Sequence, residues 1–102
     1  MILNDDSAAS LFSQLGNVTR LKIVRALVRA GNAGMPVGEI RNILEIPNST
    51  LSYHLRFLAN VGLVRQNREG TVLRCFIDYR YIDGIVKFLT EACCSADPNY
   101  QP

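Results

Sequence analysis

A chain of 102 residues is long enough for one domain with a modest hydrophobic core. Apolar residues make up 48% of it, which excludes general disorder, and no apolar run is long enough to cross a membrane. The first residues lack the basic and apolar regions of a signal peptide, so we expect a cytoplasmic protein with no membrane partner. The net charge of +2 does not by itself indicate a nucleic-acid partner.

Two amphipathic helices are predicted in the first third of the chain. Apolar residues spaced by three or four predict a helix over residues 6–15, which Gly16 ends. Asn17 is expected to cap a second, longer helix. Its inward stripe is expected to be Val18, Leu21, Ile23, Val24, Leu27 and Val28, and its solvated residues Arg20, Lys22, Arg25 and Arg29.

A pair of short helices is predicted next. Pro36 opens the first, with Val37, Ile40, Ile43 and Leu44 expected inward, and the second covers residues 47–61 after a short turn. The second helix carries apolar residues on one face and hydroxyl and amide groups on the other, which is typical of a helix that lies in the DNA major groove. The only histidine is expected on its surface near DNA rather than in a metal site. The expected DNA contacts of this helix are Asn48, Ser49, Thr50, Ser52, Tyr53, His54 and Arg56.

A β-hairpin is predicted directly after this helix. Residues 63–68 and 71–77 read as strands joined by a tight turn, and such a hairpin is typical of a wing. Arg68 and Thr71 at its tip are expected to contact a neighbouring phosphate backbone or the minor groove. Residues 48–80 contain five arginines but only one glutamate and one aspartate; this excess suits phosphate contact, although solvated arginines would give the same count.

The last predicted helix covers residues 81–96, so one domain spans 1–96 and residues 97–102 form a disordered tail. Its apolar residues favour a dimer, because one small domain leaves little core for them. That apolar stripe consists of Ile82, Ile85, Val86, Leu89 and Cys93, with Phe88 on its flank.

Three cysteines, two of them adjacent, do not indicate a structural disulfide framework. Cys75 and Cys93 fit simple packing, but Cys94 points about 100° away from Cys93 on the predicted helix. Neighbouring thiolates select thiophilic ions, and trivalent arsenic or antimony takes up to three sulfurs. Cys75, Cys93 and Cys94 are therefore candidate ligands for such an ion, with Cys75 and one of the pair the natural choice for a methylated arsenical. Sensing of redox state or reactive sulfur, and simple packing, remain alternatives.

In this order the motifs resemble the ArsR-type winged-helix repressors. The resemblance covers about residues 6–94 and rests on LGNVTRLKIV (15–24), STLSYHLRFL (49–58), GLV (62–64) and REG (68–70). It implies a mostly α fold with a β-hairpin wing, a winged helix-turn-helix, in a homodimer held by the first and last helices. It also implies binding to a palindromic operator, as double-stranded DNA, and repression until an inducer binds.

The resemblance implies no obligatory cofactor, and its inducer would be trivalent arsenic or antimony, inorganic or methylated. The Cys-x-Cys site that some members carry is absent, because the matching positions are Pro36, Val37 and Gly38.

Two other classes of function compete with a repressor. An enzyme is not expected, because a thiol reductase needs a cysteine at a helix N-terminus or a Cys-x-x-Cys motif, and no carboxylate pair or Ser/His/Asp set stands in a recognisable context. A winged-helix adaptor that does not bind DNA is the other alternative, but such domains usually lose the polar outer face that residues 47–61 keep.

Overall fold

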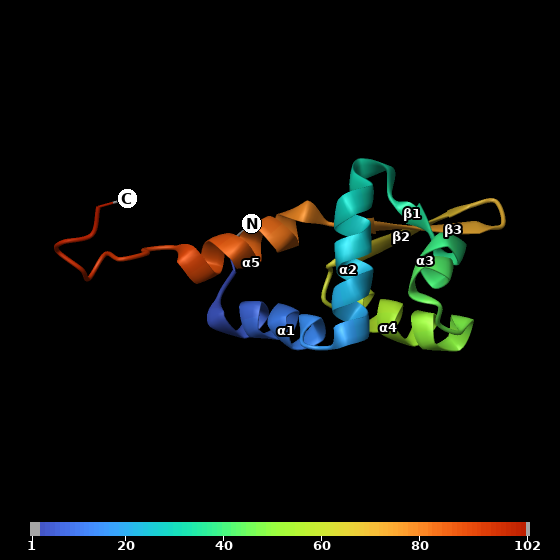
Figure 1. Ribbon diagram of the computed structural model, residues 1–102, viewed down its shortest axis with the longest axis horizontal. Helices are drawn as coiled ribbons and strands as arrows, with labels where there is room; N and C mark the ends of the chain where they lie inside the picture. Colours follow the sequence, from blue (N-terminus) through green and yellow to red (C-terminus); the bar gives the residue numbers. More distant parts are fainter. Residues whose placement is uncertain (1–2, 102) are drawn as a thin grey trace.

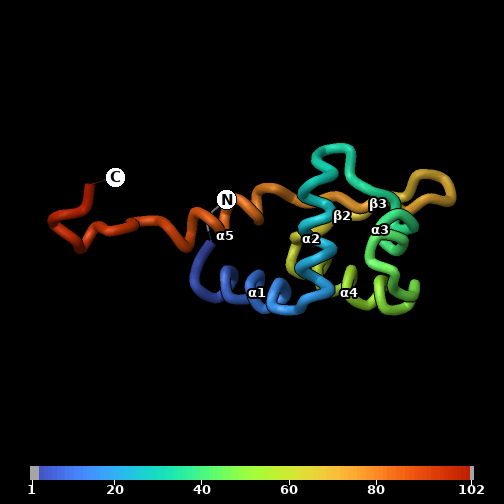
Figure 2. The backbone as a smooth tube through the Cα atoms, viewed as in Figure 1, coloured from blue at the N-terminus to red at the C-terminus, as the bar shows by residue number. Residues whose placement is uncertain are grey.

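The computed structural model describes residues 3–101 as helices arranged around a small antiparallel sheet (Figure 1). The helices are α1 (Asp5–Leu15), α2 (Val18–Ala30), α3 (Val37–Leu44), α4 (Asn48–Asn60) and α5 (Tyr79–Thr90), with one 3-10 turn, η1 (Gly31–Ala33). The strands are β1 (Met35–Pro36), β2 (Val64–Glu69) and β3 (Val72–Ile77). The molecule measures 56 × 23 × 22 Å, because the segment after α5 extends away from the rest (Figure 2). None of the helices in residues 3–101 combines the length and apolar character needed to span a bilayer.

Side-chain caps start both N-terminal helices. The Asn4 side chain accepts a hydrogen bond of 2.8 Å from the backbone N–H of Ser7, and Ser7 bonds back to Asn4 in a capping box. The predicted cap of α2 is confirmed, since Asn17 Oδ1 accepts from the backbone N–H of Arg20 at 3.0 Å.

The core lies between α2, the helix-turn-helix and the sheet. Ile23 and Leu27 of α2 are fully buried against Leu51 and Leu58 of α4 in one apolar cluster. The inward arc of α2 is centred on these residues, so the expectation that Val18, Leu21 and Val28 point inward is wrong: all three are exposed. Ile43 of α3 is exposed as well, against expectation, whereas Ile40 is buried.

The sheet has three strands in the order β1-β3-β2, all antiparallel. The hairpin of β2 and β3 confirms the predicted wing, with Val64 opposite Ile77 and Glu69 opposite Val72. The strand β1 was not predicted; its two residues pair with Cys75 and Arg74 and are too few to produce a periodic pattern.

The last helix differs from the prediction at both ends. It begins earlier because Asp78 caps it, accepting from the backbone N–H of Arg80 at 3.1 Å. It ends at Thr90, not residue 96, because no large apolar side chain follows Leu89 until Tyr100 to hold further turns against the core. Ala92 and Cys94 instead adopt positive φ angles of 56° and 63° in a series of turns. The disordered tail of residues 97–102 stays a prediction, and residues 1, 2 and 102 lie outside the described part of the chain.

Candidate nucleic-acid interface

The helix-turn-helix consists of α3, a turn through Glu45, and α4. Glu45 ends α3 in the left-handed region, at φ 54°, and Pro47 then starts α4. The inner face of α4 is sealed in the core by three buried leucines, Leu51, Leu55 and Leu58. The opposite face is open to solvent, as predicted. It carries the exposed side chains of Asn48, Ser49, Ser52, Tyr53 and Arg56, with Thr50 half-buried beside them.

The first turn of α4 offers an electropositive end to a phosphate group. Pro47 provides no side-chain cap, so the first backbone N–H groups of the helix have no capping side chain. Arg41 of α3 donates a 2.8 Å hydrogen bond to Asn48 Oδ1, which brings a guanidinium to this end. The sequence prediction missed Arg41; the signal that could have found it is its place in the last turn of the helix before α4.

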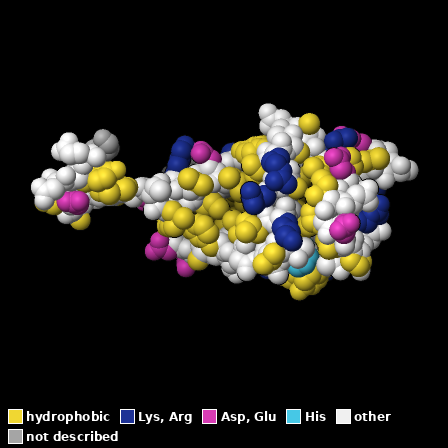
Figure 3. All heavy atoms as spheres, viewed as in Figure 1, with side chains coloured by type: hydrophobic (Ala, Val, Ile, Leu, Met, Phe, Trp, Pro, Cys, Tyr) yellow, Lys and Arg dark blue, Asp and Glu magenta, His cyan; other side chains and the backbone are white. Residues whose placement is uncertain are grey.

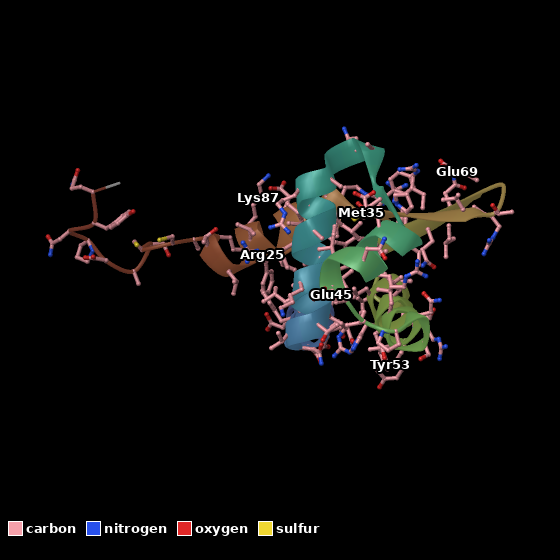
Figure 4. All side chains as sticks on the ribbon, turned by 45° about the vertical axis from the view of Figure 1, so that its right-hand side comes forward. Arg25, Met35, Glu45, Tyr53, Glu69 and Lys87 are labelled. Atoms are coloured by element: carbon pink, nitrogen blue, oxygen red, sulfur yellow. The ribbon has the colours of Figure 1, made fainter. Side chains whose placement is uncertain are left out.

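Arg74 braces the wing, while two side chains near its turn are exposed. Arg74 donates to Glu69 Oε1 at 2.9 Å across the hairpin and to the carbonyl of Ala33 at 3.2 Å. The second bond ties the hairpin to the loop before β1, while Arg68 and Thr71 are exposed, as predicted. Figure 1 shows the wing and the N-terminal end of α4 at the same end of the molecule, and Figure 4 labels Tyr53 and Glu69 there. A duplex at that end would meet both elements.

His54 does not belong to the outer face of α4. Its side chain is 8% exposed, so the expected surface position is wrong. Its Nδ1 lies 3.3 Å from an Arg20 nitrogen and accepts from it, since arginine only donates. Burial, and then the charge of Arg20, lower the pKa of His54 below its ordinary value of 6.5.

The sequence pattern indicates a solvated Arg20 side chain, and this expectation is wrong because Arg20 is half-buried. Its Nε donates a 2.7 Å hydrogen bond to the carbonyl of Gln14 in α1, and its guanidinium lies 5.3 Å from the ring centroid of Phe57 in α4. Tyr53 packs edge-on against the same Phe57 ring. Arg20 therefore connects α1, α2 and α4 behind the outer face of α4.

The cysteines are separated by the fold. Cys75 is 0% exposed inside the core, where burial raises the pKa of its thiol and the Gln66 amide donates to its sulfur at 3.7 Å. Cys93 and Cys94 lie beyond α5 at the surface, with their sulfurs 2.9 Å apart. The hydrogen bond with Cys93 is the main cause that raises the pKa of Cys94.

Within one chain Cys75 is therefore enclosed apart from the surface pair, and the three sulfurs form no cluster. A third sulfur from a partner chain and binding by the pair alone are the other arrangements that the sequence left open. Packing explains Cys75, which lies on a strand in the middle of the core. Within residues 3–101, no group of three or more His, Cys, Asp or Glu side chains is placed to hold a metal ion. The exposed thiol pair remains as the candidate sulfur site.

An apolar surface covers the side of the molecule formed by α1 and α5. Val86 and Leu89 of α5 are 56% and 68% exposed, and Phe88 is half-buried next to them. Figure 3 shows hydrophobic side chains gathered over these two helices. Such a patch on a small domain is typical of a protein–protein contact.

Sequence comparison places the chain among helix-turn-helix proteins. Residues 15–67 match the family described as "Helix-turn-helix domain". An uncharacterised HTH-type transcriptional regulator of Methanocaldococcus jannaschii is 35% identical, over 84% of this chain and 94% of that protein. The transcriptional repressor PagR of Bacillus anthracis is 34% identical, over 87% of this chain and 85% of the repressor. A homologue of the cadmium resistance transcriptional regulatory protein CadC from Staphylococcus aureus is 31% identical, over 82% of this chain and 68% of that protein.

Structural comparison gives the same fold over nearly the whole chain. A crystal structure of an ArsR family transcriptional regulator, RHA00566, matches with a TM-score of 0.78 at 21% identity, covering 98% of this chain and all of that one. The solution structure of the homodimeric winged helix-turn-helix DNA-binding domain Mb0332 of Mycobacterium bovis matches with a TM-score of 0.67 at 25% identity, covering 94% and 89% of the two chains.

Proposed function

The chain belongs to the ArsR-type winged-helix transcriptional regulators, and on this basis we propose that it binds an operator as a homodimer and releases it when a thiophilic compound bridges Cys93 and Cys94. Proteins of this kind are DNA-binding regulators and not enzymes. The observation that carries the DNA-binding part is the two-sided character of α4, whose inner face is sealed by leucines while its outer face carries polar groups and Arg56.

Reading of the operator is assigned to α4 and the wing. Hydroxyl and amide groups of α4 reach base edges in the major groove, while Arg56, Arg68 and the N-terminal end of α4 meet phosphates. The two α4 helices of a dimer would lie about 34 Å apart, one turn of DNA, for a palindromic site. The apolar surface of α1 and α5 supports the dimer, since the side chains of Val86 and Leu89 are more than half exposed.

The pair of Cys93 and Cys94 suits a compound that carries two leaving groups on one thiophilic atom. A monosubstituted trivalent arsenical, such as methylarsonous acid, carries two hydroxyl groups on arsenic. Each thiol forms one As–S bond and gives its proton to a departing hydroxyl group, so that two water molecules leave and no electrons are transferred. The 2.9 Å separation of the two sulfurs supports this reaction, because both are within reach of one arsenic atom. Arsenite could fill its third position with sulfur only at Cys75, which is enclosed in the core, so on this pair it would keep one hydroxyl group.

The position of Cys93 and Cys94 suggests how binding of the arsenical changes the affinity for DNA. Cys93 and Cys94 follow α5, the helix assigned to the dimer, so bridging them alters the end of that helix. The other end of α5 meets the wing, since Asp78, which caps α5, has its Oδ2 4.0 Å from Arg65 Nε of β2. A shift of α5 would therefore change the placement of the wing. A coupling of 1–3 kcal/mol would weaken operator binding by about 5–150-fold.

The experiment measures binding of the purified, reduced protein to a duplex from upstream of its own gene, with methylarsonous acid, arsenite or hydrogen peroxide added. We expect methylarsonous acid to raise the Kd at least tenfold, and arsenite to act more weakly. A Cys93→Ser/Cys94→Ser variant should bind the duplex with the Kd of the unaltered protein, and the arsenical should not raise that Kd. Cys75→Ala is the matched control and should respond like the unaltered protein.

Each outcome separates the two parts of the proposal. Release that persists in the double variant would contradict the sulfur site but leave operator binding intact. Release by peroxide alone would assign the pair to redox sensing. Absence of duplex binding, or binding that ignores salt, would contradict the repressor function and favour an adaptor.

A further inference from the structure

A surface groove between α2 and the end of α3 belongs neither to the DNA-reading surface nor to the expected dimer surface. It has a volume of about 520 Å³ and contains no residue of α1, α4, α5 or the wing. Its apolar floor includes three of the four side chains that sequence periodicity assigned to the core but the structure leaves exposed. These are Val18, Leu21 and Ile43, which are 71%, 45% and 51% exposed.

Three cations line the α2 side of this groove. Lys22, Arg25 and Arg29 follow the same face of α2, and within residues 3–101 none of them makes an ion pair or a side-chain hydrogen bond. Figure 3 shows Lys and Arg side chains gathered over α2 on the viewed face. Glu45, which Figure 4 labels with Arg25, lies on the other side of the groove and leaves the balance positive.

We propose that this groove binds an acidic amphipathic helix of a partner protein. The cations are spread over eight residues, about 10 Å along the axis of α2, so they do not converge on one anionic group. Carboxylates spaced by three or four residues along a helix repeat over the same distance and can meet all three cations. Leucine or phenylalanine side chains beside those carboxylates would cover the apolar floor, as in other helix-in-groove contacts.

The openness of the groove argues against a small anion as the occupant. Small-molecule sites usually cover 70–90% of the ligand surface. A floor residue that is 71% exposed, as Val18 is, leaves such a ligand mostly in water. DNA is also disfavoured, because phosphates gain nothing from the exposed valine, leucine and isoleucine.

The test uses a fluorescein-labelled 18-residue peptide with glutamates along one helical face and leucines along the next. A control peptide has the same composition in a shuffled order that breaks both stripes. Binding to the full-length protein is followed by fluorescence anisotropy, with the protein free and bound to the operator duplex. We expect the striped peptide to bind at least tenfold more tightly than the shuffled peptide, and to bind the protein–DNA complex as well.

Charge-reversal variants test whether the peptide binds in the groove. Lys22→Glu/Arg25→Glu should weaken peptide binding at least tenfold and change the Kd for the duplex less than threefold. Leu21→Asn should weaken peptide binding without altering the charge, and Arg68→Glu on the wing should weaken only duplex binding.

Three results would overturn the proposal. Equal binding of the two peptides, or none, would mean that no helix-specific site exists. A loss of duplex binding in Lys22→Glu/Arg25→Glu that matches its loss of peptide binding would make the stripe a phosphate contact. A change of dimerisation in that variant, measured by sedimentation, would make the groove a contact between copies of this chain.

Discussion

Arg20 is a residue whose surroundings decide its role. Its guanidinium bonds the end of α1, contacts the buried ring of His54 and packs over Phe57 of α4. Arg29, nine residues later on the same helix, is exposed. The two arginines of this helix thus have different roles. Arg20 connects α1, α2 and α4, whereas Arg29 places a charge at the surface.

Replacement of Arg20 tests this difference. Arg20→Gln removes the hydrogen bond to Gln14 and the contact with Phe57, so we expect the free energy of unfolding to fall by about 1–2 kcal/mol. Urea unfolding followed by circular dichroism measures the change. Arg29→Gln is the matched control and should change stability by less than about 0.5 kcal/mol. Equal effects would show that the contacts of Arg20 do not stabilise the fold.

His54 makes stability depend on pH in a defined direction. Its pKa is lowered in the folded protein, so the folded state favours the neutral ring. The unfolded chain takes up a proton near pH 6.5 and the folded chain only at lower pH. Between these values the unfolded state binds more protons, so we expect stability to be complete above pH 6.5 and to decrease as pH falls through the folded-state pKa.

Urea midpoints at pH 7.5, 6.5 and 5.5 check the effect of His54. The comparison protein is His54→Gln, which lacks the only histidine and should show a flatter dependence over this range, whatever its overall stability. A parallel dependence in both proteins would assign the effect to other groups.

At the scale of the elements, the loop between α2 and α3 contains two glycines with similar backbone angles and different surroundings. Gly31 has a φ of 69° and open space where a Cβ would stand, whereas Gly34 has a φ of 65° and close neighbours there. A Cβ on Gly34 would collide with the carbonyl of Cys75 and lie 2.6 Å from the ring of Phe76. Gly34 is what allows β1 to approach β3 and complete the sheet.

Alanine substitution separates the two effects. Gly31→Ala costs the strain of φ 69° with ψ −151°, a combination that almost only glycine adopts, about 1–3 kcal/mol. Gly34 has similar angles, and Gly34→Ala adds the collision with the β3 backbone, so we expect its loss to be larger by about 1–3 kcal/mol. Thermal and urea unfolding of both variants measures the difference. Similar losses would mean that β1 can move away from β3 at little cost.

At the scale of the whole molecule, the wing and the thiol pair, which we propose to bind DNA and an inducer, lie at opposite ends of a molecule that is 56 Å long. Figure 1 places the wing at one end and the segment after α5 at the other. The helix α5 lies between them, with Asp78 next to the wing and the thiol pair after its last turn. In the proposed function, binding at the thiols would therefore act on the DNA-binding surface through α5.

Charged substitutions on the apolar surface of α1 and α5 test the dimer. Val86→Asp/Leu89→Asp places two carboxylates in the expected contact, so we expect a monomer in sedimentation experiments and a Kd for a palindromic duplex that is at least tenfold higher. Val72→Asp on the exposed side of the wing is the control and should remain dimeric. A dimer that persists in the double variant would place the contact elsewhere.

The sequence by itself determined the features that depend on neighbours a few residues apart. Asn17 as a helix cap, the polar outer face of α4 and the hairpin after it all follow from short-range spacing. The family resemblance rested on the same segments, and the comparisons confirm it.

Only the tertiary structure decided which side chains are enclosed. Arg20 and His54 meet across 34 residues of sequence, and Cys75 lies in the core because β3 is the central strand of a sheet whose first strand has two residues. Periodicity placed Val18, Leu21 and Val28 inside because it cannot tell which of two apolar arcs of a helix the rest of the chain will cover. Burial depends on contacts between distant segments, and no local pattern contains them.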